Sequence, residues 1–188
     1  MQAELSVELG AEDPTLAVPW TDPEGRLSYV NLRESLDSIS EIQEAFTFSE
    51  LRDFLLAVNT APSALQSAKC DAWFSEEISE EEAIFGAQCK FGSYVDAFFY
   101  VPPPRYSFPM HEAFGKRLVE LLKRAPELPA SFEAIIRRAH FENGSAVKEG
   151  FYFTLYVIGF GDDEQNARQA WGIALRLVGN ALLQISSL

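Results

Sequence analysis

The sequence predicts an α+β fold, in which an antiparallel sheet forms one layer and helices lie mainly on one of its faces. Two strand–strand–helix segments follow one another, at residues 69–125 and 131–186. The chain has 188 residues, of which 47% are hydrophobic, enough to bury a core without a metal or disulfide. We therefore expect one domain over residues 1–188, in which 1–34 form an N-terminal strand and hairpin extension and 35–188 the main core.

The N-terminal extension has the periodicity of strands. Residues 5–9 alternate apolar and polar side chains, as a half-buried strand does. Residues 15–20 and 26–30 flank the segment Asp22-Pro23-Glu24-Gly25, where proline followed by glycine indicates a turn. The extension is therefore expected to contain a β-hairpin.

Three regions carry apolar side chains at helical spacing. Residues 35–59 predict one bent or two short helices, and a further short helix is expected over residues 63–68. Residues 109–125 predict the clearest helix, because Pro109 suits its first turn and basic residues suit its C-terminal end. A long final helix follows Gly161, and its apolar surface is wider than a single stripe.

The remaining strands form two pairs. Residues 69–75 and 83–101 flank an acidic turn, and residues 131–141 and 150–160 flank a turn with Asn143-Gly144. The last strand is almost continuously apolar, which is typical of a strand at the centre of a sheet. The predicted order is a β-hairpin followed by α-β-β-α-β-β-α, with ββα as a candidate pseudo-repeat.

This order of elements is similar to the secretion-chaperone-like fold, and such chaperones are also small and acidic. The resemblance rests on topology and on no sequence motif. It implies, by analogy of fold alone, a role in binding another protein.

The charge of the chain is negative and unevenly distributed. The formal net charge is -13; residues 1–82 hold 18 acidic and 4 basic residues, and residues 83–188 hold 10 acidic and 11 basic ones. An acidic surface repels phosphate backbones, so nucleic-acid binding is not expected. The acidic half either keeps the protein soluble or steers a basic partner toward it.

The expected location is the cytoplasm, without a membrane partner. No segment approaches the roughly 20 apolar residues of a membrane helix, and the first residues lack the pattern of a secretory signal. Cys70 and Cys89 are therefore expected as reduced thiols. The alternative is a cross-strand disulfide, if residues 68–75 and 84–91 pair so that the two cysteines lie nearly opposite each other.

The sequence contains no established catalytic or metal-binding motif. Cys70, Cys89, His111 and His140 lack the short paired spacings of a zinc site, so neither a metal nor another cofactor is expected. The weak catalytic candidates are His111 as general base, with Asp96 and Arg105 as neighbours. A partly exposed helix histidine is the simpler interpretation of His111.

The strand aromatics belong mostly to a core, but they would line a groove if one sheet face lacked helices. The candidate partner- or ligand-binding residues are Trp73, Tyr94, Phe98, Tyr100, Tyr106 and Trp171.

Three functions from different classes follow from these observations. The first is a non-enzymatic protein-interaction module, chaperone- or adaptor-like, which binds a protein partner or itself as a homodimer through the final helix. Under this hypothesis Trp171→Glu or Leu175→Glu either unfolds the protein or yields a folded monomer. The second is a cupped sheet that holds a small apolar ligand, and the third is an enzyme that uses His111 with Asp96 or Arg105.

Overall fold

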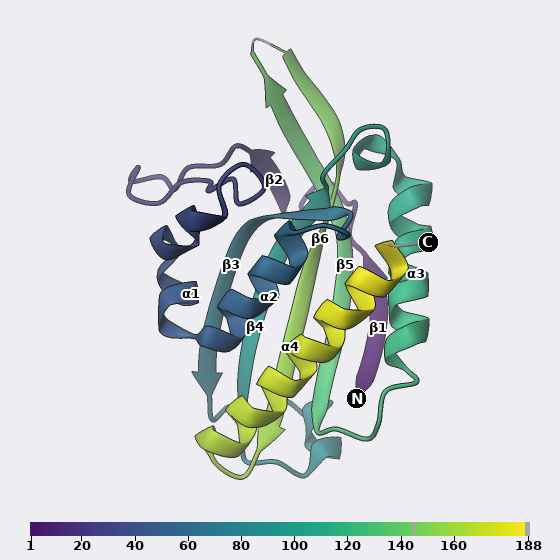
Figure 1. Cartoon of the computed structure of the whole chain (residues 1–188). Helices are drawn as coiled ribbons and strands as arrows, with labels where there is room; N and C mark the ends of the chain where they lie inside the picture. The colour runs from purple at the N-terminus through teal and green to yellow at the C-terminus, as the bar shows by residue number, and fades with distance from the viewer. Residues whose placement is uncertain (145, 187–188) are drawn as a thin grey trace.

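A six-stranded sheet forms one layer of the protein, and the helices form the other (Figure 1). The computed structural model describes residues 1–144 and 146–186. The α+β class predicted from the sequence is confirmed. The strands are β1 (Gln2–Val7), β2 (Thr15–Val18), β3 (Leu65–Ser75), β4 (Cys89–Phe99), β5 (Ala130–Asn143) and β6 (Ala146–Gly161).

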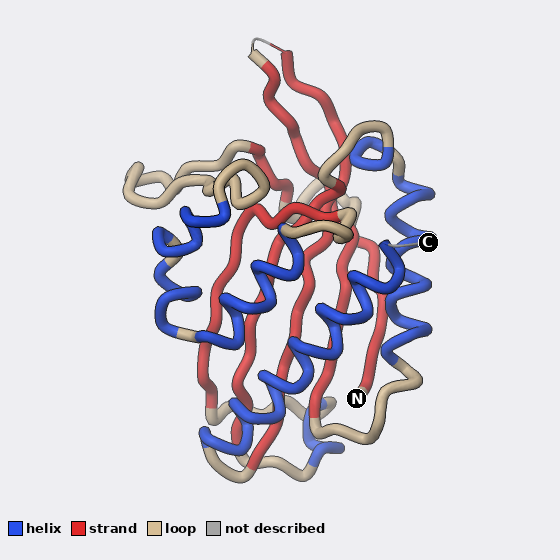
Figure 2. Tube along the Cα trace, viewed as in Figure 1, coloured by secondary structure: helices blue, strands red, loops and turns tan. Residues whose placement is uncertain are grey.

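The helical layer lies in front of the sheet in Figure 2. The α-helices are α1 (Gln43–Thr47), α2 (Ser49–Asn59), α3 (Phe108–Leu122) and α4 (Glu164–Ser186). Short 3₁₀ helices occur at η1 (Leu36–Glu41), η2 (Glu82–Phe85) and η3 (Pro104–Tyr106).

Residues 63–68, expected as a short helix, instead lead into β3. Polar partners outside this segment hold it extended. The Asn59 amide donates to Ser67 Oγ at 2.7 Å, and the Ser67 N–H donates to Asn59 Oδ1 at 3.0 Å. Gln66 likewise donates to Asn31 Oδ1 at 2.7 Å. These buried hydrogen bonds outweigh the local preference for a helix.

The strand order is β1-β5-β6-β4-β3, and β2 also pairs with β5. β6 therefore lies at the centre of the sheet, as its apolar sequence predicts. β3–β4, β4–β6 and β5–β6 are antiparallel, whereas β1 and β2 both run parallel to β5. The expected N-terminal hairpin reduces to a turn closed by the Thr21–Ser28 bridge. Pairing with β5 buries Leu16 and Val18, which a local hairpin would leave without a core.

The final helix, α4, lies between α2 and α3 and packs on β6 and β4 (Figure 1). Trp171 of α4 is fully buried between the helix and the sheet, and its indole N–H donates to Ser93 Oγ on β4 at 2.9 Å. The wide apolar surface of α4 is therefore covered within the same chain by two helices and the sheet. This arrangement removes the sequence-based reason for assigning α4 to a dimer interface.

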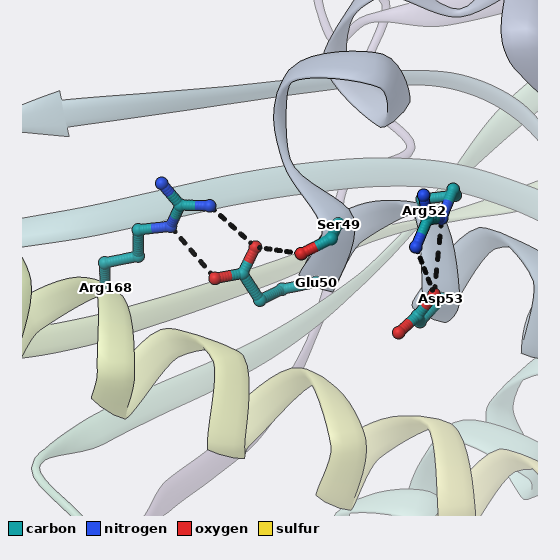
Figure 3. Close-up of polar contacts among 5 residues, drawn as sticks. All are labelled: Ser49, Glu50, Arg52, Asp53 and Arg168. Atoms are coloured by element: carbon teal, nitrogen blue, oxygen red, sulfur yellow. Dashed lines mark hydrogen bonds and ion pairs between the residues drawn. The ribbon is translucent and has the colours of Figure 1, made fainter.

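An ion pair ties α4 to α2 on the outside of the helical layer (Figure 3). The Arg168 guanidinium donates to both oxygens of Glu50, at 2.9 Å each, and Ser49 donates to the same carboxylate. The hydrogen bond from Arg168 lowers the pKa of Glu50. Bidentate geometry fixes the direction of both side chains, so this pair adds a specific polar contact to the apolar packing between the two helices.

Candidate functional site

The sheet face opposite the helices is the candidate site, because α1 to α4 all lie on the other face (Figure 1). Side chains alternate between the two faces along each strand. On β4, Phe91, Val95 and Phe99 enter the core beneath the helices, so Tyr94 and Asp96 point to the opposite face. We call the exposed part of this opposite side the open face, made up of Trp73, Tyr94, Tyr156, Glu4, Lys69, Asp71 and Glu133.

Two short segments cover the ends of this side of the sheet. At one end Trp20, from the segment after β2, packs on a small cluster with Phe98, Phe141 and Tyr152. At the other end Phe85 of η2 stacks on Phe160, with ring centroids 4.1 Å apart. The open face lies between these two coverings.

Aromatic side chains form the centre of the open face. Tyr94 and Tyr156 are paired across β4 and β6, with ring centroids 6.0 Å apart. Trp73 on β3 lies against Gly92, where a Cβ atom would approach the indole Cζ2 to 2.9 Å. All three aromatic residues are half-buried, so part of each ring is available for contact.

A chain of buried polar groups crosses the sheet beside these aromatics. Thr154 Oγ1 donates to Asp96 Oδ1 at 2.7 Å and accepts from Arg137 at 2.8 Å. Arg137 Nε donates in turn to Glu8 at 2.7 Å. Burial raises the pKa of Asp96 to about 6, an effect that the Thr154 hydrogen bond partly offsets. The groups link β4, β6 and β5 to the end of β1, and this linkage accounts for Asp96 without a catalytic role.

A hollow of about 540 Å³ lies on the open face next to η2. Glu4, Glu133 and Tyr156 line it on the sheet side, and Glu81 and Glu82 line it on the η2 side. Glu82 is paired with Lys90 at 2.7 Å. The cationic groups in the lining are Lys123 and the amino group of Met1, so acidic groups outnumber basic ones.

His111 lies on the other side of the sheet from Asp96. It is fully buried in α3 against Phe99 and Phe153, at centroid distances of 4.7 and 4.9 Å. Its Nδ1 lies 3.0 Å from the Ser107 carbonyl oxygen, and burial lowers its pKa to about 4. The histidine is thus a neutral core residue, not the partly exposed helix residue that we expected.

The third catalytic candidate, Arg105, also has a packing role. Its guanidinium carbon lies 5.0 Å from the ring centroids of both Phe98 and Phe141, and its Nε donates to the Phe99 carbonyl at 3.0 Å. The structure therefore does not bring His111 to Asp96 or Arg105.

The structure separates the six predicted binding residues into four groups. Trp73 and Tyr94 meet on the open face. Phe98 is buried and Tyr106 packs on Phe141, so both support the small aromatic cluster. Tyr100 is 46% exposed beyond β4, with the Arg33 guanidinium carbon 4.7 Å from its ring centroid. Trp171 belongs to the core.

Neither cysteine has the geometry of a redox or metal site. The register places Cys70 opposite Val95 and Cys89 opposite Gly161, so the two do not face each other, and both thiols are free. Burial, followed by the charge of Glu44, raises the pKa of Cys70 to about 12. Within residues 1–144 and 146–186, no group of three His, Cys, Asp or Glu side chains could hold a metal ion.

Over the same residues, no helix has the length and apolar composition that crossing a bilayer requires. Comparison with known protein families, curated proteins and solved structures finds no match to this chain.

Proposed function

We propose that this chain is a protein-interaction module, which binds a basic segment of a partner protein on its open face. The observation that carries the proposal is made on the described residues: half-buried aromatics lie beside acids that form no ion pair, on the sheet face opposite the helices. Aromatic rings that are partly exposed provide contact area at a small entropic cost, as binding surfaces require.

The charges of the open face favour a basic partner. Among the described residues, ion pairs engage Glu8 and Glu82, but none engages Glu4, Asp71 or Glu133. The cations on this side of the sheet include Lys69, which is exposed, and Lys123 and the Met1 amino group, which line the hollow beside four glutamates. The net charge of -13 extends this field around the molecule and would speed the encounter with a cationic partner.

The same charges disfavour a homodimer through this face. A second copy would place Glu4, Asp71 and Glu133 against like charges, which costs free energy at an interface. We therefore propose a different, basic protein as the partner, in a chaperone- or adaptor-like role. Two free thiols fit the reducing cytoplasm as the place of this function.

The two alternative functions have less support. The hollow on the open face is lined by several carboxylates, which disfavours a purely apolar ligand at that position. The enzyme alternative needs His111 beside Asp96 or Arg105, and these residues lie on opposite faces of the sheet.

The test uses the three tryptophans as reporters in a ¹H–¹⁵N spectrum. Trp73 lies on the open face, Trp20 at its covered end and Trp171 in the core. We expect an unstructured peptide of alternating lysine and leucine to shift the Trp73 indole signal and to leave that of Trp171 unchanged. Binding should weaken as salt is raised, because exposed charges are screened.

A matched pair of charge reversals tests the surface. Asp71→Lys/Glu133→Lys should weaken peptide binding by about tenfold or more, equivalent to about 1.4 kcal/mol. Asp53→Lys/Glu120→Lys changes the net charge equally on the helical layer and should weaken it much less. Equal weakening by both variants, an unmoved Trp73 signal, or a dimer that forms through the open face would contradict the proposal.

A further inference from the structure

A second cavity, of about 320 Å³, lies at the edge of β3. The segment after β2 forms one wall, the start of α1 forms another, and residues 67–70 of β3 form the floor. This cavity is separate from the acidic hollow beside η2, because the two share no lining residue. Its volume falls at the lower end of the range of small-molecule sites.

Hydrogen bonds hold the wall that follows β2 in place. The indole N–H of Trp20 donates to the Ala68 carbonyl oxygen at 2.6 Å, and the Tyr29 N–H donates to the Trp20 carbonyl at 2.9 Å. The Leu27 N–H donates to Asp22 Oδ1 at 2.7 Å, and the Asp22 N–H donates to the Leu27 carbonyl at 2.9 Å. The cavity is therefore preformed, so a ligand would not have to order this wall.

The lining of the cavity combines apolar and acidic side chains. Val30, Ile42 and Leu55 supply aliphatic surface, and Trp20 adds an aromatic ring. Three carboxylates, of Asp22, Glu41 and Glu44, also line the cavity. An apolar interior with a small number of charged groups is typical of a site that selects one end of a ligand by charge.

The electrostatics of the cavity favour a cation. Among the described residues that line the cavity, Lys69 carries the one cationic side chain, and its ammonium nitrogen lies 5.5 Å from the centroid of the Trp20 ring. The lining therefore holds three residues with a carboxylate and one with an ammonium group. Burial raises the pKa of the Cys70 thiol, another lining residue, and the charge of Glu44 adds to this rise.

We propose that this cavity binds a small primary amine with an apolar chain. The chain would lie between Val30, Ile42 and Leu55, and the ammonium group would lie near Glu41 and Glu44. An anion of the same shape meets three like charges, and a neutral analogue loses the attraction of the carboxylates. This site adjoins the proposed partner-binding face, with which it shares Lys69, but the residues proposed to hold the amine lie outside that face.

The experiment compares hexylamine, hexanol and hexanoate, which share a chain and differ in charge. The readout is the indole N–H signal of Trp20, assigned with a Trp20→Phe variant. We expect hexylamine to shift this signal at neutral pH, hexanol to bind about tenfold more weakly, a difference of about 1.4 kcal/mol, and hexanoate not to bind. The Trp73 and Trp171 signals should stay in place, because these residues lie outside the cavity.

One charge-neutralising double variant tests the role of Glu41 and Glu44, and a second is its control. Glu41→Gln/Glu44→Gln should reduce the affinity for hexylamine to that for hexanol and leave hexanol binding unchanged. Glu120→Gln/Glu127→Gln removes the same charge at exposed positions outside the cavity and should change neither affinity. Equal binding of the three compounds, equal effects of the two variants, or an unmoved Trp20 signal would overturn the proposal.

The tryptophan signals also separate this inference from the proposed function. Failure of the peptide to move Trp73 bears on the open face alone, and failure of hexylamine to move Trp20 bears on the cavity alone. A lysine-rich peptide that shifts the Trp20 signal and displaces hexylamine would indicate that the cavity binds a side chain of a partner protein. This result would overturn the proposal of a small-molecule ligand.

Discussion

The contact between β6 and α4 leaves no room for a side chain at Gly159. A Cβ atom at this position would lie 2.1 Å from the Trp171 main-chain nitrogen and 2.4 Å from the Ala167 carbonyl oxygen. Unbonded heavy atoms normally approach to about 3.5 Å, so α4 would have to move away by roughly 1.4 Å at the closest contact. Gly159→Ala therefore loosens the packing of the largest buried side chain, Trp171, on the sheet.

The cost of this substitution should lie at the upper end of the overpacking range. Such insertions cost about 1–3 kcal/mol, and here the opposing atoms belong to a helix backbone that cannot rotate aside. We expect the free energy of unfolding to fall by about 3 kcal/mol. For a chain of this size, that corresponds to a fall in Tm of roughly 6–12 °C. Urea titration and thermal melts followed by circular dichroism measure both quantities.

Gly179→Ala, in α4, is the matched control. Its new methyl group would have ordinary contacts, with Phe54 Cδ2 at 3.6 Å and Ala57 Cβ at 3.7 Å. Replacing a helix-interior glycine by alanine stabilises a protein by about 0.5–1 kcal/mol, so Tm should rise by roughly 1–4 °C. If Gly159→Ala is as stable as the wild type, or if both variants shift Tm in the same direction, the reasoning is refuted.

Three further predictions concern buried titratable groups. His111 has a pKa of about 4, below its ordinary 6.5, so on acidification its imidazole is protonated in the unfolded state before it is protonated in the folded state. The free energy of unfolding of the wild type should therefore fall by up to roughly 3 kcal/mol between pH 6.5 and 4, and that of His111→Leu should fall less. Urea titration at each pH measures both. The pKa of Asp96 is shifted in the opposite direction, to about 6 from its ordinary 3.8. The free energy of unfolding of the wild type should therefore fall by up to roughly 3 kcal/mol as pH rises from 4 to 6. The stability of Asp96→Asn relative to the wild type should increase over that window. A reducing agent should leave Tm unchanged, because Cys70 and Cys89 are unpaired; a lower Tm would indicate a disulfide.

The spacing of apolar residues predicted the elements that depend on the local sequence alone. The helix α3 and the central position of β6 follow directly from apolar spacing and composition. The partners of β1 and β2 could not be predicted in this way, because a strand pattern does not say which distant strand it joins. The extended start of β3 was missed for a related reason, since its hydrogen bonds go to Asn31 and Asn59.

The candidate site was predicted in part. Alternation along β4 separates Tyr94 from Val95, but it does not say which face the helices cover. Tyr156 joined the open face only through the register that pairs it with Tyr94. Trp171 was assigned to a binding surface because α4 is apolar over a wide surface, and that width reflects its central position between two helices.

The pairing of β1 and β2 with β5 also has a consequence for biosynthesis. Both segments are made long before Ser131–Phe141, the stretch of β5 to which they hydrogen-bond. During translation they have no edge to join until α3 has been made, so the sheet closes late and its contacts span much of the sequence. Removal of residues 1–18 would leave that edge of β5 unpaired, where it could recruit a strand from another molecule.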